Sequence, residues 1–460
     1  MQTTGLVRVT IATPRRRIDM ALPEHAAIAE ILPGLLARAG EGLADDGVAD
    51  GGWLLRRADG TAFDLDRTLG AHRVRDGEIL HLTARRLDWP ELEYDDLVDA
   101  IATGSGRAGR AWGPRHTRLA GLAAGASAML LGLVAVLRAG PPWASPAQWA
   151  LGAAALLLVA GVVLARAIGD AEAGAVLAAV ALPFAFVGGG LLLAGDNPVT
   201  GLSPGHLLLA GAALLLAALV GYLGVVAAPA LFAGAATVGL LGVLGGWLAT
   251  TDAVAGYRAA AVVGAGLLVL STVFAPLALR LGRVPMPVLP RSTADLVRDD
   301  PQPPLALVHA AVARADALLT GLLAGACAVV LCCQVVLVRS GSEAGVVLVA
   351  VLSVGFLLRA RLYPILRQRI PLLATGMVGV GCLVVGPVMA DRAGLLAMTG
   401  PLLFVVAAAV IAAGVVLSTR AANPYLGRFA EYFEVLVMVA IVPVACSVLG
   451  LYGYVRGLGG

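Results

Sequence analysis

The side chains that most often take part in catalysis or metal binding are sparse in this chain and far apart. Its histidines are His25, His72, His81, His116, His206 and His309. None of them stands at a spacing from cysteines or carboxylates that is typical of a metal site. A membrane-embedded enzyme would need such groups to converge. We therefore predict no metal site and no catalytic histidine, and we expect ordinary surface or packing histidines.

The cysteines and the basic residues exclude further chemistry. The cysteines lie in apolar runs without CxxC spacing, as small packing residues do; they are Cys327, Cys332, Cys333, Cys382 and Cys446. All 33 basic residues are arginines. A P-loop needs a lysine to reach the phosphates of ATP, and Schiff-base catalysis needs a lysine amine. We therefore predict that the chain is not an enzyme, has no cofactor and cannot itself be a standard ATP motor.

The elements that position these residues are mostly apolar. The chain has 460 residues, 59% of them hydrophobic and 14% charged, against about 25% charged in ordinary soluble domains. Sixteen of the 33 arginines lie in residues 1–118, so a soluble head precedes a membrane body. The opening residues lack the apolar segment and cleavage site of a secretory signal. We expect the head to stay in the cytoplasm.

Residues 1–88 show the pattern of a small α+β domain. Alternating residues predict strands at 6–12 and 16–22 around a turn at Pro14, and apolar spacing predicts a helix before Gly40. Two further strands are predicted at 52–58 and 77–85, next to Asp-Gly turns. This order resembles the β-grasp fold of ubiquitin-like domains. No diglycine tail follows, so conjugation is not implied, and an adaptor or docking role is expected.

A connector at residues 89–118 is acidic at first and then basic. The basic part contains Arg107, Arg110, Arg115 and Arg118, directly before the first long apolar run. Arginines at this place are typical of a cytoplasmic membrane flank, where anionic lipid headgroups attract them. We therefore expect contact with membrane lipids and no nucleic-acid binding.

Residues 119–456 are predicted to form an all-α membrane domain with about eleven transmembrane helices. The apolar runs lie at 119–137, 147–165, 173–194, 206–223, 226–249, 259–279, 317–338, 345–358, 371–390, 395–417 and 435–455. If the head is cytoplasmic, sixteen of the arginines next to the predicted spans lie on the cytoplasmic side of the membrane and five lie on the outer side. This bias predicts a multi-pass membrane protein with a cytoplasmic N-terminus and an external C-terminus.

The predicted spans carry no Asp, Glu, Arg or His away from their ends. Carriers coupled to ions or protons usually keep such groups near the membrane midplane, so this class is disfavoured. The spans are instead rich in glycine. Gly121 with Gly125, and Gly321 with Gly325, have the GxxxG spacing that lets helices approach closely. These four are candidate helix-packing residues, either within one bundle or at a dimer face.

A proline-rich stretch at residues 283–304 lies in a predicted cytoplasmic loop, 280–316. Its prolines favour extended structure, and helical periodicity resumes at about residue 305. The candidate docking residues are Arg283, Pro285, Met286, Pro287, Val288, Leu289, Pro290 and Arg291. The apolar anchors among them favour a docking strap over a passive connector.

The order of these parts, together with RVPMPVLPR and the terminal NPYLGRFAEYFEVLVMVAIVP, resembles the EccD family of ESX (type VII) secretion systems. The resemblance covers essentially the whole chain. It implies a non-enzymatic scaffold or channel subunit that docks an FtsK-like ATPase through its head and loops. It also implies a homodimer within a larger complex with EccB-, EccC- (the ATPase) and EccE-like subunits, in contact with membrane lipids.

An alternative of another class stays open. The chain could be a facilitator-type transporter of a neutral or apolar solute, with the head as a regulatory domain. Gln334 and the glycine-rich breaks would then be its binding groups.

Overall fold

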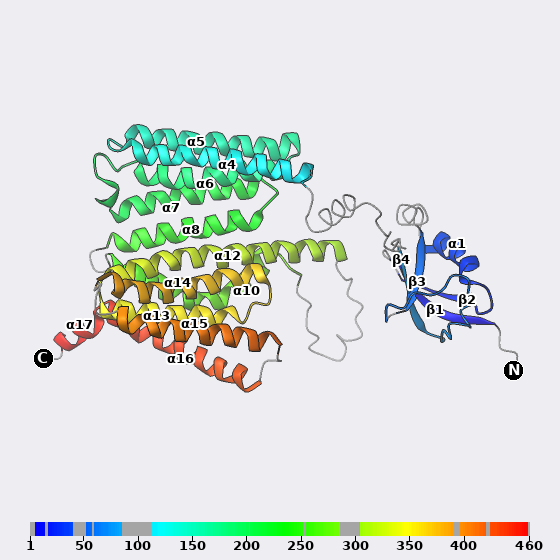
Figure 1. Cartoon of the computed structure of the whole chain (residues 1–460). Helices are drawn as coiled ribbons and strands as arrows, with labels where there is room; N and C mark the ends of the chain where they lie inside the picture. Colours follow the sequence, from blue (N-terminus) through cyan, green and yellow to red (C-terminus); the bar gives the residue numbers. More distant parts are fainter. Residues whose placement is uncertain are drawn as a thin grey trace, which may run out of the picture. The chain divides into compact units, whose positions relative to one another are not determined.

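The computed structural model describes residues 5–13, 17–39, 52–57, 59–84, 112–201, 203–251, 254, 256–285, 304–390, 396–419 and 424–458. The chain divides into two compact units, Met1–Ala111 and Trp112–Gly460 (Figure 1). Each unit has its own apolar core, so each is described by itself.

The first unit has the order of elements that the sequence predicts. It contains β1 (Leu6–Ala12), β2 (Arg17–Pro23), α1 (Ile28–Ala39), β3 (Trp53–Arg57) and β4 (Glu78–Ala84). The sheet order is β2-β1-β4-β3, in which β1 runs parallel to β4 and the other neighbours are antiparallel. The predicted β-grasp order is confirmed.

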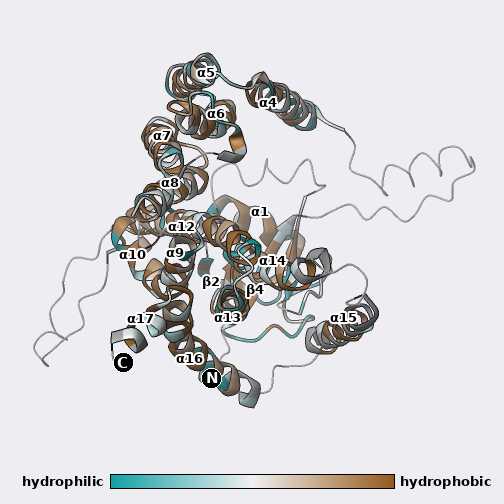
Figure 2. Cartoon of the chain, turned by 90° about the vertical axis from the view of Figure 1, so that its left-hand side faces the viewer, coloured by the Kyte–Doolittle hydropathy of each residue, from teal (hydrophilic) through white to brown (hydrophobic). Residues whose placement is uncertain are grey.

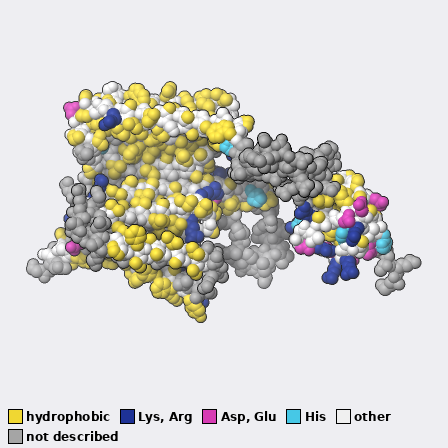
Figure 3. Space-filling view, viewed as in Figure 1, with side chains coloured by type: hydrophobic (Ala, Val, Ile, Leu, Met, Phe, Trp, Pro, Cys, Tyr) yellow, Lys and Arg dark blue, Asp and Glu magenta, His cyan; other side chains and the backbone are white. Residues whose placement is uncertain are grey.

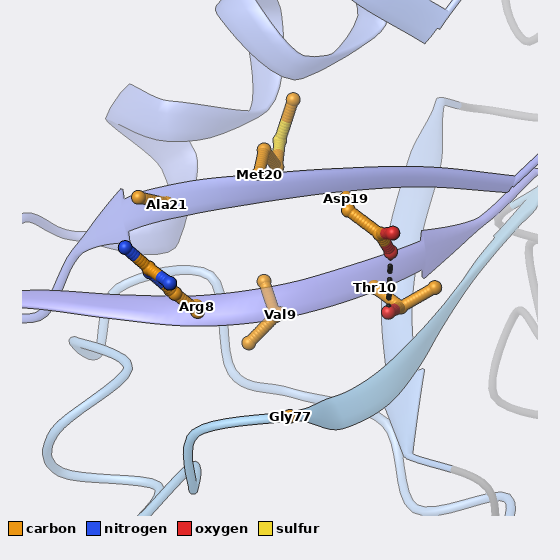
Figure 4. A pocket seen from close by; sticks show the side chains of 7 residues that line it. All are labelled: Arg8, Val9, Thr10, Asp19, Met20, Ala21 and Gly77. Carbon is orange, nitrogen blue, oxygen red and sulfur yellow. Dashed lines mark hydrogen bonds between the residues drawn. The ribbon is translucent and has the colours of Figure 1, made fainter.

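Buried and more exposed side chains alternate along the strands, and the buried ones form the core of this unit. Val7, Val9 and Ile11 of β1 are buried and meet Ile28 and Leu35 of α1 in one cluster. Successive strand side chains point to opposite faces, so the residues between them face away from this core. Figure 4 shows this alternation at β1 and β2, where the hydroxyl of Thr10 donates to Oδ1 of Asp19 at 2.6 Å.

The second unit is helical. Its helices are α4 (Pro114–Ala139), α5 (Ala144–Val163), α6 (Ala171–Leu191), α7 (Pro204–Gly224), α8 (Pro229–Ala249), α9 (Tyr257–Leu270), α10 (Phe274–Leu281), α12 (Leu305–Arg339), α13 (Glu343–Ala360), α14 (Leu366–Ala390), α15 (Leu396–Thr419), α16 (Pro424–Val448) and α17 (Leu451–Leu458). Among the described residues, ten helical segments are long and apolar enough to cross a membrane. Helix α15 adds the shorter apolar segment Leu403–Val416, so the prediction of about eleven spans is close.

The long helices lie side by side (Figure 1). Seen from the end in Figure 2, α5, α6, α7, α8 and α12 follow one another, and α9, α13, α14 and α16 lie beyond them. One buried cluster includes Trp143, Phe184 and Phe232, and a second includes Leu352 and Phe356. The visible face of this unit is covered mostly by apolar side chains (Figure 3), as a lipid environment requires.

The last predicted span, 435–455, is wrong in its boundaries. Helix α16 begins at Pro424, its membrane-length segment is Gly427–Val448, and α17 follows after Gly450, whose φ is 76°. Glu434 therefore lies inside this candidate segment, within eight residues of its start and so near a span end, where charged residues are expected. The charged residues in NPYLGRFAEYFE lower the local hydropathy, so the apolar pattern places the start of the span too late. Two arginines pair with Glu434, as described below, and allow the helix to continue through this stretch.

Candidate docking and helix-packing sites

The proline-rich loop leaves the helical unit from a tightly packed helix end. Helix α10 ends at Leu281, and a Cβ atom on Gly282 would lie 2.7 Å from the Cβ atom of Ala315 on α12. Only glycine fits at this contact. The end of α10 is therefore pressed against α12, where the loop begins.

The chain then turns sharply outwards. Arg283 is exposed and has a left-handed φ of 54°, and the N–H of Val284 donates to the carbonyl of Leu279 at 3.1 Å. Pro285 is also exposed. The remaining candidate docking residues, Met286, Pro287, Val288, Leu289, Pro290 and Arg291, lie outside the described residues. The predicted helix after the loop is α12, which has 35 residues and begins at Leu305.

The candidate glycines on α12 lie in a close helix–helix contact, which we call the α8–α12 seam. A Cβ atom on Gly321 would lie 2.5 Å from the carbonyl oxygen of Ala230, and one on Gly325 would lie 2.5 Å from that of Gly234. Gly234 is itself on α8, and its own Cβ position is 3.2 Å from the oxygen of Gly321. Three glycines thus let the two backbones touch directly, as small residues do in membrane helix pairs.

The candidate glycines on α4 have different surroundings. A Cβ atom on Gly121 or Gly125 would meet no heavy atom within 4 Å, apart from neighbours on its own helix. Both residues are exposed, whereas Met129 and Leu133 of the same helix pack against the core. The structure therefore does not bring these glycines against another helix of the chain.

Polar side chains tie the helices together at one end of the bundle. Arg118, at the start of α4, pairs with Asp170 before α6 at 2.5 Å. Arg166, which follows α5, donates to the carbonyls of Leu223 and Gly224 at 2.9 Å and so caps the C-terminus of α7. All these residues lie at the end that the arginine bias predicts to be cytoplasmic.

The C-terminal half of the unit has two further ties at this same end. Asp316 of α12 pairs with Arg367 and accepts a hydrogen bond from Gln368 of α14 at 2.7 Å. Among the described residues of the helical unit, the recorded ion pairs are confined to this end of the bundle. Ion pairs at the edge of the hydrocarbon layer keep their charges near water, which makes them far less costly than at midplane.

The last of these ties is the most buried, and sequence reasoning missed it. Arg359 of α13 and Arg361 just after it each place a guanidinium nitrogen 2.8 Å from a different carboxylate oxygen of Glu434 on α16. The side chain of Arg359 is only 8% exposed. A usable signal was present, because opposite charges flank the eighth and eleventh predicted spans at the same predicted membrane face.

Gln334, the binding group that the transporter alternative requires, is fully buried. Its amide atoms have no hydrogen-bond partner among the described residues, and a Cβ atom on Gly379 of α14 would lie 2.6 Å from its Nε2. It is thus packed directly against α14. The neighbouring hydroxyls of Ser353 and Thr375 donate to carbonyls of their own helices.

The structure and the matches to known proteins together define the class of protein. The family described as EccD-like transmembrane domain matches residues 117–458, and that described as the WXG100 protein secretion system protein YukD matches residues 6–82. The protein is thus a multi-spanning membrane protein with a ubiquitin-like head. The chain belongs to the EccD family.

Curated relatives and solved structures agree with this assignment. The ESX-4 secretion system protein eccD4 of Mycobacterium tuberculosis (strain ATCC 25618 / H37Rv) is 28% identical over 99% of this chain and 98% of its own length. The ESX-3 protein EccD3 of Mycolicibacterium smegmatis is 36% identical over 26% of each chain. Protomer 1 of an ESX-3 core complex shares the fold, with 23% identity, a TM-score of 0.60 and coverage of 98% of this chain and all of the other. A chain of a MycP5-free ESX-5 inner membrane complex is similar at 18% identity, with a TM-score of 0.58 over 89% of this chain and 99% of the other.

Proposed function

We propose that this chain is a non-enzymatic scaffold or channel subunit of a type VII secretion complex in the bacterial cytoplasmic membrane. The observation that carries the proposal is the end-to-end match to an ESX-4 eccD4 protein, which includes the head and the helical unit. Membrane subunits of ESX systems match both by family and by fold.

The absence of lysine supports an energy source outside this chain. A chain without lysine cannot provide the phosphate-contacting lysine of a P-loop. In our proposal the energy comes from an EccC-like, FtsK-type ATPase, and EccB- and EccE-like subunits complete the complex. The head is the natural docking element, because its compact β-grasp core does not depend on the helical unit.

The proline-rich loop is proposed as the second docking element. Arg283 and Pro285 are exposed directly after the tightly packed end of α10, so the loop starts from a rigid base. A rigid base limits the conformational freedom that binding must remove, and this favours docking over passive connection. The arginine bias supports placing this loop and the N-terminus in the cytoplasm, with the C-terminus outside.

The exposed glycines on α4 support self-association. Gly121 and Gly125 form a small-residue face that no helix of this chain covers within the described residues. Close packing of a second copy on this face would bury it in the way that Gly321 and Gly325 are buried in the α8–α12 seam. We therefore propose that α4 contributes to a homodimer within the complex.

The test is co-purification of the tagged full chain in mild detergent from cells that carry the whole secretion locus. We expect a large complex that contains an FtsK-like ATPase. Replacing residues 285–290 with a Gly/Ser segment of equal length should lose the ATPase, as should deleting residues 1–88. The matched control is the same replacement at residues 250–255, between α8 and α9 at the opposite end of the bundle, which should keep it.

A purified monomer or homodimer with no ATPase, together with full uptake of a neutral solute, would overturn the scaffold proposal in favour of the transporter. If the variant with residues 285–290 replaced still retains the ATPase, the loop is a passive connector and the head is the docking element.

A further inference from the structure

A pocket of about 460 Å³ lies where the end of α13 meets the first turns of α16. Its polar residues include Arg359, Arg361, Glu434 and Glu431, and its apolar residues include Val435 and Val439. A volume of this size is within the usual range for small-molecule sites. The pocket belongs neither to the proposed docking loop nor to the packing glycines.

Two arginines and two glutamates line the pocket, so its formal charges balance. Glu434 uses both carboxylate oxygens, one for each arginine, so one carboxylate faces two guanidinium groups. Arg361 also donates to the carbonyl of Gly427 at 3.1 Å. The Nε atoms of Arg359 and Arg361 have no hydrogen-bond partner within the described part of the chain.

The two guanidinium groups keep N–H donors that Glu434 does not satisfy. A guanidinium group has five N–H donors, and a buried arginine without a full set of acceptors is costly. The Nη2 atom of Arg359 has only a weak hydrogen-bond acceptor, because its partner is the Sδ atom of Met438 at 3.7 Å. The two Nε atoms are buried and out of reach of a ligand, but each Nη group carries two N–H donors and has one partner. The oxygens of a phosphate group in the pocket can therefore accept hydrogen bonds from the Nη groups.

A second feature of the pocket limits the chemical class of ligand that it can bind. Glu431 lies one turn before Glu434 on α16, lines the same pocket and is exposed. Among the described residues it has no recorded hydrogen bond or ion pair. A carboxylate beside the phosphate position repels a purely anionic ligand and attracts a cationic donor. The pocket therefore fits a group that carries a phosphate and an amine together.

The apolar wall indicates where the rest of the ligand lies. Val435 and Val439 follow the two glutamates along α16 and are 62% and 65% exposed, and Leu362 beside the arginines is 53% exposed. Charged groups at one end of a spanning helix, followed by an exposed aliphatic stripe, match a lipid headgroup and its acyl chains. A free phosphate ion would leave this stripe unused.

We propose that the pocket binds one phospholipid of the phosphatidylethanolamine type. Its phosphate is held by Arg359 and Arg361, its ammonium group by Glu431, and its acyl chains lie along Val435 and Val439. The bound headgroup completes the ion cluster that ties α16 to α13. The site is independent of the proposed role in secretion, because it needs no other subunit.

The test is native mass spectrometry of the purified full chain with equal amounts of phosphatidylethanolamine, phosphatidylglycerol and phosphatidylcholine. We expect the wild-type chain to retain phosphatidylethanolamine preferentially. Glu431→Gln should reduce this preference by about threefold, since it removes one partly exposed ion pair. Arg361→Gln should weaken retention of all three lipids by about tenfold, since it removes a charge-assisted hydrogen bond.

The matched control is Arg369→Gln, which removes an exposed arginine of α14 that does not line the pocket. It should leave lipid retention unchanged. Inorganic phosphate at millimolar concentration should not displace the lipid, because it cannot use the apolar wall.

Three results would overturn the proposal: an unaltered lipid preference in Glu431→Gln, preferential retention of phosphatidylglycerol by the wild-type chain, or displacement of the lipid by inorganic phosphate. Glu431 is exposed and lies outside the ion cluster, so its variant stays informative even if Arg361→Gln does not fold. Because the measurement uses the isolated chain, its failure is distinguishable from a failure to assemble a secretion complex.

Discussion

The α8–α12 seam and the outer face of α4 carry the same sequence motif in opposite surroundings. Gly321 and Gly325 touch the backbone of α8, whereas Gly121 and Gly125 face open space. The surrounding sequences, GLLAGACAVVL and GLAAGASAMLL, are also similar. A GxxxG motif therefore permits a close approach of helices but does not select the partner.

The difference follows from what lies opposite each motif. Helix α8 presents Gly234 to α12, so that glycines on both helices allow contact between the two backbones. Helix α4 packs through larger side chains, such as Met129 and Leu133, and its glycines lie beside that contact. A close approach requires small residues on both sides, and α4 finds none at this position within the described chain.

The largest effect is expected for Gly325→Leu in the seam. A leucine at this position must displace the backbone of α8, because even a Cβ atom would lie 2.5 Å from the oxygen of Gly234. We expect a loss of about 3 kcal/mol in the free energy of unfolding, at the upper end for overpacked cores. Thermal unfolding in mild detergent, followed by size-exclusion chromatography, measures it. A wild-type melting temperature would show that the seam separates easily.

A smaller loss is expected for Gly321→Ala. The added methyl group meets the carbonyl oxygen of Ala230 at 2.5 Å, but the two helices can separate slightly to admit it. We expect a loss of about 1–2 kcal/mol, measured in the same way. Gly266→Ala on α9 is the control, since a Cβ atom there would meet nothing within 4 Å. Equal melting temperatures for the two variants would contradict the tight seam.

A still smaller effect is expected when α4 loses its ion pair. Arg118 and Asp170 are partly exposed, so Arg118→Gln should cost about 0.5 kcal/mol. Thermal unfolding in mild detergent measures this loss. A loss as large as that of Gly325→Leu would mean that the ion pair, and not apolar packing, holds α4 beside α6.

The smallest effect on the isolated chain is expected for Gly125→Leu. No heavy atom lies near its Cβ position, so the free energy of unfolding should change by less than about 0.5 kcal/mol. If a second copy packs on this face, the same variant should reduce the dimer fraction in chemical cross-linking. A large loss of stability in the monomer would show that another part of the chain covers this face.

Much of this architecture was predictable because its signals are local. Strand alternation and Asp-Gly turns predict the order of the head, and long apolar runs predict spans in number and approximate place. The error in the last span has the same origin, since a local hydropathy scan penalises Glu434 and cannot register that Arg359 and Arg361 neutralise it. The charge partners are 75 and 73 residues apart in sequence, as the difference between residue numbers shows.

Composition and short-range periodicity were enough to predict the division into a head and a membrane body, the approximate number of spans and the absence of lysine chemistry, because each residue contributes to these properties without reference to a distant partner. The resemblance to the EccD family rests on the order of these parts together with RVPMPVLPR and NPYLGRFAEYFEVLVMVAIVP. The tertiary structure was needed to show which GxxxG motif is packed against another helix, which charged residues meet near the start of α16, and that a pocket lies between α13 and α16. Each of these depends on two helices that meet in space, and helix packing, not local propensity, determines which surfaces are brought together.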